Sequence, residues 1–274
     1  MGKETGIAWT DHTFNIAWGC FKVSPGCKHC YAETFSKRTG HDIWGPPETT
    51  SRRTFGAKHW TEPLAWNAAA KREGVRKRVF CSSMCDVFED HPTIATEREK
   101  LWPLIRATPQ LDWQLLTKRP ERIAANLPDD WGTGYPNVWL GTSIESREYG
   151  LRIPQLLRAP AALHFLSVEP MLAAVRVEPE HLSAKPHSDW CGPGFECDDI
   201  CPTVCGHAGR KISWVIVGGE SGPGHREMPL DDALALIDAV KASGSSVFVK
   251  QDSGPKPGRQ GRIPDAYWIQ EMPD

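Results

Sequence analysis

Three cysteines with the spacing C-x6-C-x2-C lie near the start of the chain, in the stretch GCFKVSPGCKHCYAE. These residues are Cys20, Cys27 and Cys30, and they fall between an expected strand and an expected helix. Three thiolates can hold three irons of a four-iron cluster and leave the fourth iron open to an exogenous chelating molecule. The alternatives are a zinc site completed by a fourth ligand such as His29, or cysteines without a metal. Placement between a strand and a helix favours a [4Fe–4S] cluster.

A second group of cysteines lies in a glycine-rich insertion at about 176–211 and has the spacing C-x5-C-x3-C-x3-C. Its members are Cys191, Cys197, Cys201 and Cys205. Four close thiols are typical of a closed zinc site or an auxiliary iron–sulfur cluster, with His207 as a spare ligand. The alternative is a loop of free thiols. We expect Cys81 and Cys85 to be small buried residues rather than ligands.

The composition is that of an ordinary soluble globular protein, with 40% hydrophobic and 24% charged residues. No signal peptide or membrane span is apparent, so we expect a cytoplasmic protein, in which clustered cysteines indicate metal or redox chemistry. The formal net charge of −2 argues against DNA binding through bulk electrostatics. Basic residues are nevertheless grouped locally, as at 71–78, either as solvated faces or as phosphate contacts.

Short apolar runs alternate with helical patterns along the chain. We expect strands at Phe14–Trp18, Val79–Ser82, Trp113–Thr117, Val138–Thr142, Leu163–Val168, Trp214–Val217 and Val247–Lys250. We expect helices at Tyr31–Arg38, Leu64–Glu73, Ile94–Thr108, Pro120–Asn126, Ser146–Leu157 and Leu230–Ala242. This alternation predicts an α/β fold, either an open sheet or a partial or full (β/α) barrel. We expect one domain over 1–274, with a long loop at 40–63 over its mouth.

Polar residues recur where the expected strands end. Four charged residues lie at the ends of four successive expected strands: Glu145, Glu169, Glu220 and Lys250. Because barrels and open α/β sheets place their sites at the carboxyl ends of strands, we expect these side chains to converge on one mouth. The alternative is that such loops simply carry helix caps.

The cysteine loop resembles the pattern GC-x-K-VS-x-GC-x-x-CYAE of the phage and prophage three-cysteine-motif family of radical S-adenosylmethionine (SAM) proteins. Further blocks similar to that family are SSMCDVFED, LLTKRPER, VWLGTSIES, FLSVEP, VIVGGESGPGHR and FVKQ. The first gap of six residues departs from C-x3-C-x2-C, the commonest spacing of the radical SAM superfamily, and fits this branch. The resemblance covers nearly the whole chain outside the insertion, and it implies a radical SAM-type (β/α) barrel.

The resemblance implies two cofactors. Cys20, Cys27 and Cys30 would ligate a [4Fe–4S] cluster, and SAM would chelate the open iron. An electron from the cluster would cleave SAM to a 5′-deoxyadenosyl radical that takes a hydrogen atom from the substrate. Candidate SAM-binding residues are Ser82, Ser83 and Asp86 for the methionyl amine, Ser143 and Glu145 for the ribose, and Gly218 and Gly219 of the GGE motif. That motif lies on a late strand, so it has the alternative of facing substrate. Candidate catalytic residues are Glu169, Glu220 and Lys250.

Members of the resembled family act in thymine hypermodification of viral DNA. The expected activity is isomerisation of 5-Nα-glycinylthymidine to 5-Cα-glycinylthymidine in phage DNA, which protects that DNA from host restriction. The substrate carboxylate requires a cation, for which Lys118, Arg119, Arg226 and Lys250 are the candidates. The expected partners are DNA and an electron donor such as flavodoxin or ferredoxin, in the host cytoplasm.

A base within a duplex cannot reach a buried cluster, so we expect the nucleotide to be flipped or unpaired. The loop 40–63 and the segment 71–78 are candidates for holding the strand, with a barrel plug or a dimer contact as the alternative for the loop. Two other functions stay open: a radical SAM lyase for DNA photoproducts or another base-modifying radical SAM enzyme, and a non-catalytic DNA-binding protein with zinc in both cysteine groups.

Overall fold

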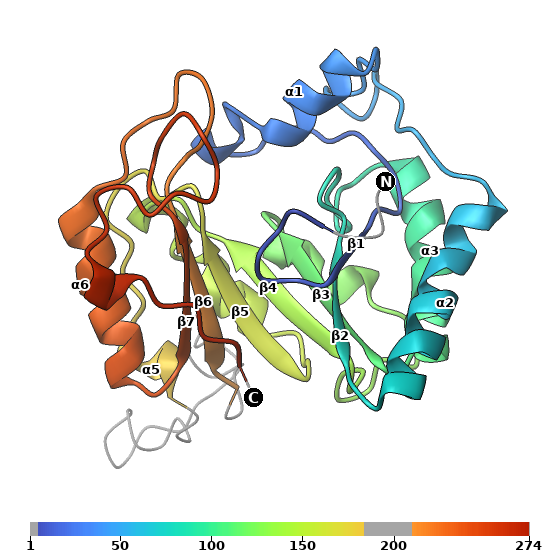
Figure 1. The fold of residues 1–274 in the computed structure, drawn as a ribbon. Coiled ribbons are helices and arrows are strands. Elements are labelled where there is room, and N and C mark those ends of the chain that lie inside the picture. Colours follow the sequence, from blue (N-terminus) through green and yellow to red (C-terminus); the bar gives the residue numbers. More distant parts are fainter. Residues whose placement is uncertain (1–4, 184–209, 274) are drawn as a thin grey trace, which may run out of the picture. The chain divides into compact units, whose positions relative to one another are not determined.

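In the part of the chain that the structure describes, seven strands, ordered in the sheet as they occur in the chain, form the framework of this α/β protein (Figure 1). The computed structural model describes residues 5–183 and 210–273. The strands are β1 (His12–Phe14), β2 (Lys77–Cys81), β3 (Leu111–Thr117), β4 (Val138–Ser143), β5 (Leu163–Val168), β6 (Ile212–Gly218) and β7 (Ser246–Gln251). The helices are α1 (Tyr31–Arg38), α2 (Ala57–Glu73), α3 (Pro92–Ala107), α4 (Arg152–Leu157), α5 (Pro179–Leu182) and α6 (Leu230–Ala242). The chain divides into two compact units, Met1–Gly141 and Thr142–Asp274.

In the first unit, β2 pairs in parallel with both β1 and β3. The register sets Phe14 opposite Cys81 and Cys81 opposite Leu115. The loops that follow these three strands therefore leave the same edge of the sheet. Helix α2 packs against β2, β3 and α3, and Figure 1 shows α2 and α3 side by side. Phe14 is fully buried between the ring of His59, 4.5 Å away, and that of Trp113, 5.7 Å away.

In the second unit, β6 pairs in parallel with β5 and β7. Val217 lies opposite Val168 on one side and Val249 on the other, so the carboxyl ends of these strands also share one edge. Helix α6 contacts β6 and β7 (Figure 1). Its buried positions have the helical spacing that gives one apolar face; they are Ala233, Leu236, Ile237 and Val240.

The α/β class and the parallel strands predicted from the sequence are confirmed, and α1, β5 and α6 have the predicted bounds. The first strand differs, because it runs over His12–Phe14 and ends before the predicted segment does. After Phe14 the chain bends so that the Asn15 side chain can accept the Met84 amide at 2.7 Å.

Helix α2 corrects the prediction of a loop over 40–63, because the helix already begins at Ala57. Pro63 and the neighbouring Trp and Thr residues suggested a loop, since proline is unfavourable inside a helix. Packing outweighs this preference: the rings of Trp60 and Trp66 contact Phe14 and His12 of β1 at 5.3 and 4.5 Å.

Two predicted helices are shorter than expected. The segment 120–126 forms the 3-10 turns η2 (Pro120–Arg122) and η3 (Ala124–Asn126). The segment 146–157 forms η4 (Arg147–Tyr149) followed by α4, with Gly150 between them. Gly150 accounts for the break between η4 and α4, because glycine is unfavourable inside a helix. Among the described residues, none of the helices has the length and apolarity that a membrane span requires.

Candidate functional site

The loop after β1 carries the three cysteines of the C-x6-C-x2-C motif. The backbone of Cys20 forms an isolated parallel β-bridge with that of Trp44. Cys27 ends the 3-10 turn η1 (Pro25–Cys27), and Cys30 is the N-cap residue of α1. All three are free and partly accessible. The backbone amides of Ala32 and Glu33, at the start of α1, act to lower the pKa of Cys30. The start of α1 therefore favours an anionic sulfur at Cys30.

Burial and nearby charges set the ionisation of two of these thiols. Burial raises the pKa of Cys20 well above its ordinary value, Glu89 raises it further, and Arg119 opposes both effects. Burial also raises the pKa of Cys30, against the effect of the two amides. Both thiols are therefore protonated near neutral pH in the absence of a metal. Since thiolate is the ligating form, metal binding at this loop has to release protons.

The donor set fits an iron–sulfur cluster better than a single zinc ion. In residues 5–183 and 210–273, no three Cys, His, Asp or Glu side chains converge closely enough to hold one metal ion. A structural zinc site needs four ligands around one point, whereas each cysteine of an iron–sulfur site binds its own iron. Three thiols on one loop suit the second arrangement. The second group, Cys191, Cys197, Cys201 and Cys205, lies outside the described residues, as does His207, so its metal stays a prediction.

The loop after β2 is hydrogen-bonded to the cysteine loop. Gly19 donates its amide to the Met84 carbonyl at 3.0 Å, and the Asn15 side chain contacts both Ser83 and Met84. Ser82 has a φ of 70°, in the left-handed region that glycine favours, and is buried. The structure thus brings Ser82 and Ser83, two of the predicted SAM-binding residues, beside the loop that carries Cys20.

Asp86 joins the loops after β2 and β3. Its carboxylate accepts hydrogen bonds from the Thr117 hydroxyl at 2.7 Å, the Lys118 amide at 3.2 Å and the Arg119 guanidinium at 2.8 Å. It also accepts the Phe88 amide at 3.0 Å. Both carboxylate oxygens therefore have protein donors, and the Asp86 side chain is 8% exposed. Its predicted contact with SAM stays a prediction.

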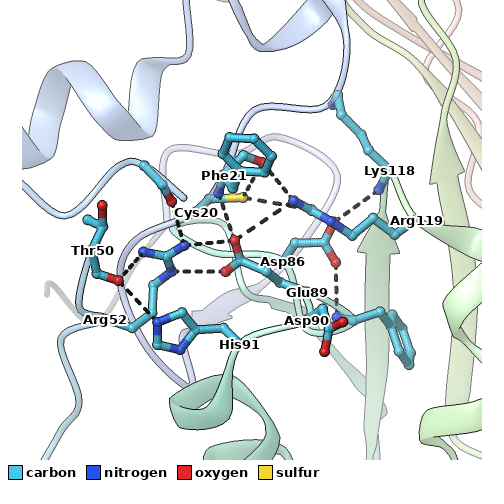
Figure 2. A network of polar contacts seen from close by, with 12 residues as sticks. Cys20, Phe21, Thr50, Arg52, Asp86, Glu89, Asp90, His91, Lys118 and Arg119 are labelled. Atoms are coloured by element: carbon cyan, nitrogen blue, oxygen red, sulfur yellow. Dashed lines mark hydrogen bonds and ion pairs between the residues drawn. The ribbon is translucent and has the colours of Figure 1, made fainter. Parts of the chain in front are cut away.

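Arg52 and Glu89 form a buried ion pair next to the cysteine loop (Figure 2). Glu89 accepts the Phe21 amide at 2.7 Å, while Arg52 donates to the backbone carbonyls of Ile43 and Gly45. Sequence reasoning missed this pair. The sequence analysis gives no role to Arg52, and Glu89 occurs in it only within the block SSMCDVFED. The only feature of the sequence that pointed to Glu89 was the occurrence of the block SSMCDVFED together with the cysteine pattern.

The second unit brings four predicted residues into two ion pairs. Lys250 Nζ lies 2.5 Å from Glu169 Oε1, across the ends of β7 and β5. The Arg226 guanidinium pairs with the carboxylate of Glu220, with Nε 3.0 Å from Oε2. The hydrogen bond to Glu220 raises the pKa of Arg226.

Close backbone packing accompanies these ion pairs. A Cβ on Gly218 would lie 3.4 Å from the Glu169 side chain, and one on Gly219 would lie 2.2 Å from the Ser253 nitrogen. Close packing therefore requires glycine at position 219 of the GGE motif, whereas a Cβ on Gly218 would make ordinary contacts.

Ser143 and Glu145, the predicted ribose contacts, share one arginine. Arg152 Nη1 donates to the Ser143 carbonyl at 2.8 Å and to Glu145 Oε2 at 2.9 Å. The Arg152 guanidinium carbon also lies 4.3 Å from the centroid of the Tyr149 ring. Glu145 is fully buried. The carboxylate is therefore charge-compensated within its own unit, and its contact with SAM stays a prediction.

Comparison with solved structures shows the class of fold. A mutant of spore photoproduct lyase matches with a TM-score of 0.52 and 11% identity, over 91% of this chain and 79% of that chain. A second lyase mutant, with bound AdoMet and dinucleoside spore photoproduct, matches with a TM-score of 0.42 and 14% identity. That match covers 59% of this chain and 46% of that chain. The protein shares its α/β fold with spore photoproduct lyase, and the α/β class predicted from the sequence is confirmed.

The family follows from the sequence. The chain belongs to the family described as "Protein of unknown function (DUF5131)", whose sequence model matches residues 4–272. No curated protein matches the chain.

Proposed function

We propose that this protein is a radical SAM enzyme that isomerises 5-Nα-glycinylthymidine to 5-Cα-glycinylthymidine in phage DNA. The observation that carries the radical SAM part is the loop after β1, which places three free cysteines between a parallel strand and a helix start. The radical SAM-like fold supports the same reading. The particular reaction is supported by the sequence blocks that resemble the phage family.

Cys20, Cys27 and Cys30 are the residues that would hold the cluster. When bound, a [4Fe–4S] cluster and SAM supply one-electron chemistry that removes a hydrogen atom from an unactivated carbon. The chain itself provides the thiols, the helix start at Cys30 and the buried Arg119 beside Cys20. We assign SAM binding to the loop of Ser82, Ser83 and Asp86.

The second unit offers residues for the ribose and the substrate. Ser143 and Glu145 are our candidates for binding the ribose of SAM. Gly218 and Gly219, at the end of β6, are further candidates for binding SAM through their backbone. Glu169, Glu220 and Lys250 are our candidates for proton handling around the glycyl group. Its carboxylate requires a cation, which Lys118, Arg226 or Lys250 can provide.

Two measurements test the proposal in order. First, the protein is reconstituted anaerobically with iron and sulfide, and its visible absorption, metal content and formation of 5′-deoxyadenosine are measured. A protein that binds zinc alone and never yields 5′-deoxyadenosine would be the non-catalytic DNA-binding protein instead. Second, the reconstituted enzyme is incubated with DNA that carries glycinylated thymine, and the nucleosides are separated chromatographically. The isomers have equal mass, so a changed retention time is the expected result.

A photoproduct lyase is the second candidate, and the fold likeness to spore photoproduct lyase favours it. The two functions separate on substrate. Conversion of cross-linked pyrimidines in irradiated DNA back to unlinked thymidines, together with an unchanged retention time for glycinylated thymidine, would replace the isomerase by the lyase.

A further inference from the structure

Arg119 enters the cysteine loop from the end of β3 and contacts both Cys20 and its neighbour. Nη2 donates to the Phe21 carbonyl at 2.6 Å, and Nη1 lies 3.9 Å from the Cys20 sulfur, within reach of a hydrogen bond to sulfur (Figure 2). The Arg119 side chain is only 8% exposed. A guanidinium so well shielded from solvent needs anionic partners to remain there.

Asp86 and Glu89 supply those partners. Arg119 Nη1 lies 2.8 Å from Asp86 Oδ2, and Nη2 lies 3.8 Å from Glu89 Oε1. Glu89 is already matched by Arg52, so that two buried carboxylates face two buried arginines. The four charges cancel, and the guanidinium of Arg119 is fixed in place with one edge toward the sulfur.

The backbone of the same loop is held on both sides. Glu89 accepts the Phe21 amide at 2.7 Å, Arg119 donates to the Phe21 carbonyl, and Gly45 donates its amide to the Cys20 carbonyl at 3.1 Å. With the peptides around Cys20 fixed in this way, the distance from its sulfur to the guanidinium is set by the fold.

From this geometry we infer that Arg119 is a positioning residue for the cluster, acting through Cys20. It orients the Cys20 sulfur and places a fixed positive charge and a hydrogen-bond donor beside that ligand. This assignment rests on the proposed function, and it replaces the sequence-based prediction that Arg119 binds the substrate carboxylate. Hydrogen bonds and positive charge at a ligating sulfur stabilise the reduced, more negative cluster and so raise its reduction potential.

The test compares Arg119→Gln with wild type by redox titration of the reconstituted cluster without SAM, followed by electron paramagnetic resonance. At a fixed poise we expect the ratio of reduced to oxidised cluster to fall about tenfold, which is ~59 mV toward negative potential for a one-electron couple. Arg119→Lys keeps the charge and should retain most of the wild-type potential. The matched control is Arg122→Gln, three residues further along, where the arginine pairs instead with the exposed Asp90.

A purely structural arginine would lower the thermal stability and the iron content of Arg119→Gln but leave the potential of the remaining clusters unchanged. That result, or a shift no larger than in Arg122→Gln, overturns the assignment while the proposed function stands. If Arg119→Gln does not fold, Asp86→Asn decides instead: loss of the neutralising carboxylate should move the potential in the positive direction, and an unchanged potential overturns the assignment. A wild-type protein that takes up no cluster contradicts the proposed function itself.

Discussion

The guanidinium of Arg52 meets the carboxylate of Glu89 through two contacts of 2.9 Å, and neither side chain is more than 1% exposed. This pair joins three segments that are far apart in the sequence. Arg52 donates to carbonyls of the loop before α2, and Glu89 belongs to the loop after β2 and accepts the Phe21 amide of the cysteine loop. The position of Cys20 thus depends on an ion pair that does not itself touch the sulfur.

Breaking this pair should destabilise the first unit strongly. Glu89→Gln leaves the buried Arg52 without a compensating charge, and we expect a loss of roughly 3–5 kcal/mol in the free energy of unfolding. Urea unfolding followed by circular dichroism measures the change. The control is Asp90→Asn, which removes an exposed partner of Arg122 and should cost less than about 1 kcal/mol. Equal losses in the two variants would show that the buried pair has no special role.

Cys27→Ala should remove the visible absorption of the reconstituted cluster without unfolding the protein. Cys27 lies in a short 3-10 turn and is partly exposed, so its loss costs little packing. Cys81→Ala is the control, because Cys81 is a fully buried free cysteine at the end of β2, and burial raises its pKa to about 12. We expect Cys81→Ala to keep its iron and sulfide content. A cluster that survives in Cys27→Ala contradicts the assignment of the ligands.

Gly19→Ala should lower the free energy of unfolding more than an alanine substitution at another glycine with positive φ. Gly19 has a φ of 111°, and an added Cβ would lie 2.5 Å from the Ile43 carbonyl oxygen. Gly40 has a φ of 82° with no atom within 4 Å of an added Cβ, so Gly40→Ala isolates the backbone strain. That strain costs about 1–2 kcal/mol. We expect Gly19→Ala to exceed this cost in urea unfolding and to bind less iron, whereas Gly40→Ala should bind normal amounts.

Asp252, in the loop after β7, should make the free energy of unfolding depend on pH. Burial opposes ionisation of Asp252, but hydrogen bonds from Arg262 and from the Ser253 amide outweigh it and lower the pKa from 3.8 to about 2. Because the folded state holds the carboxylate ionised, the stabilisation is fully present above about pH 4 and is lost as the pH falls through about 2.

Asp252→Asn should therefore lower stability by about 1–2 kcal/mol near neutral pH, after allowance for the half-exposed Arg262. The difference between variant and wild type should shrink as the pH falls below 4. Urea midpoints measured between roughly pH 7 and pH 3 test this. A difference that stays constant over that range would mean that Asp252 stabilises the loop through its shape and not its charge.

The sequence predicted the parallel α/β framework and the cysteine loop, because both depend on local patterns. An apolar run predicted β5 with its bounds, and the spacing of the three cysteines, together with their place between a strand and a helix, predicted that they are cluster ligands. The Arg52–Glu89 pair joins residues 37 positions apart, so no local pattern reveals it. Helix α2 shows the same limit, because contacts of Trp60 and Trp66 with β1 outweigh the unfavourable Pro63.

The central claim is a three-cysteine cluster with one iron open to SAM, and one measurement tests it most directly. The wild-type protein is reconstituted anaerobically and reduced, and its electron paramagnetic resonance spectrum is recorded before and after addition of SAM. We predict a [4Fe–4S] signal whose shape changes when SAM binds the open iron. A protein without such a signal, or a signal that SAM leaves unchanged, would contradict the account.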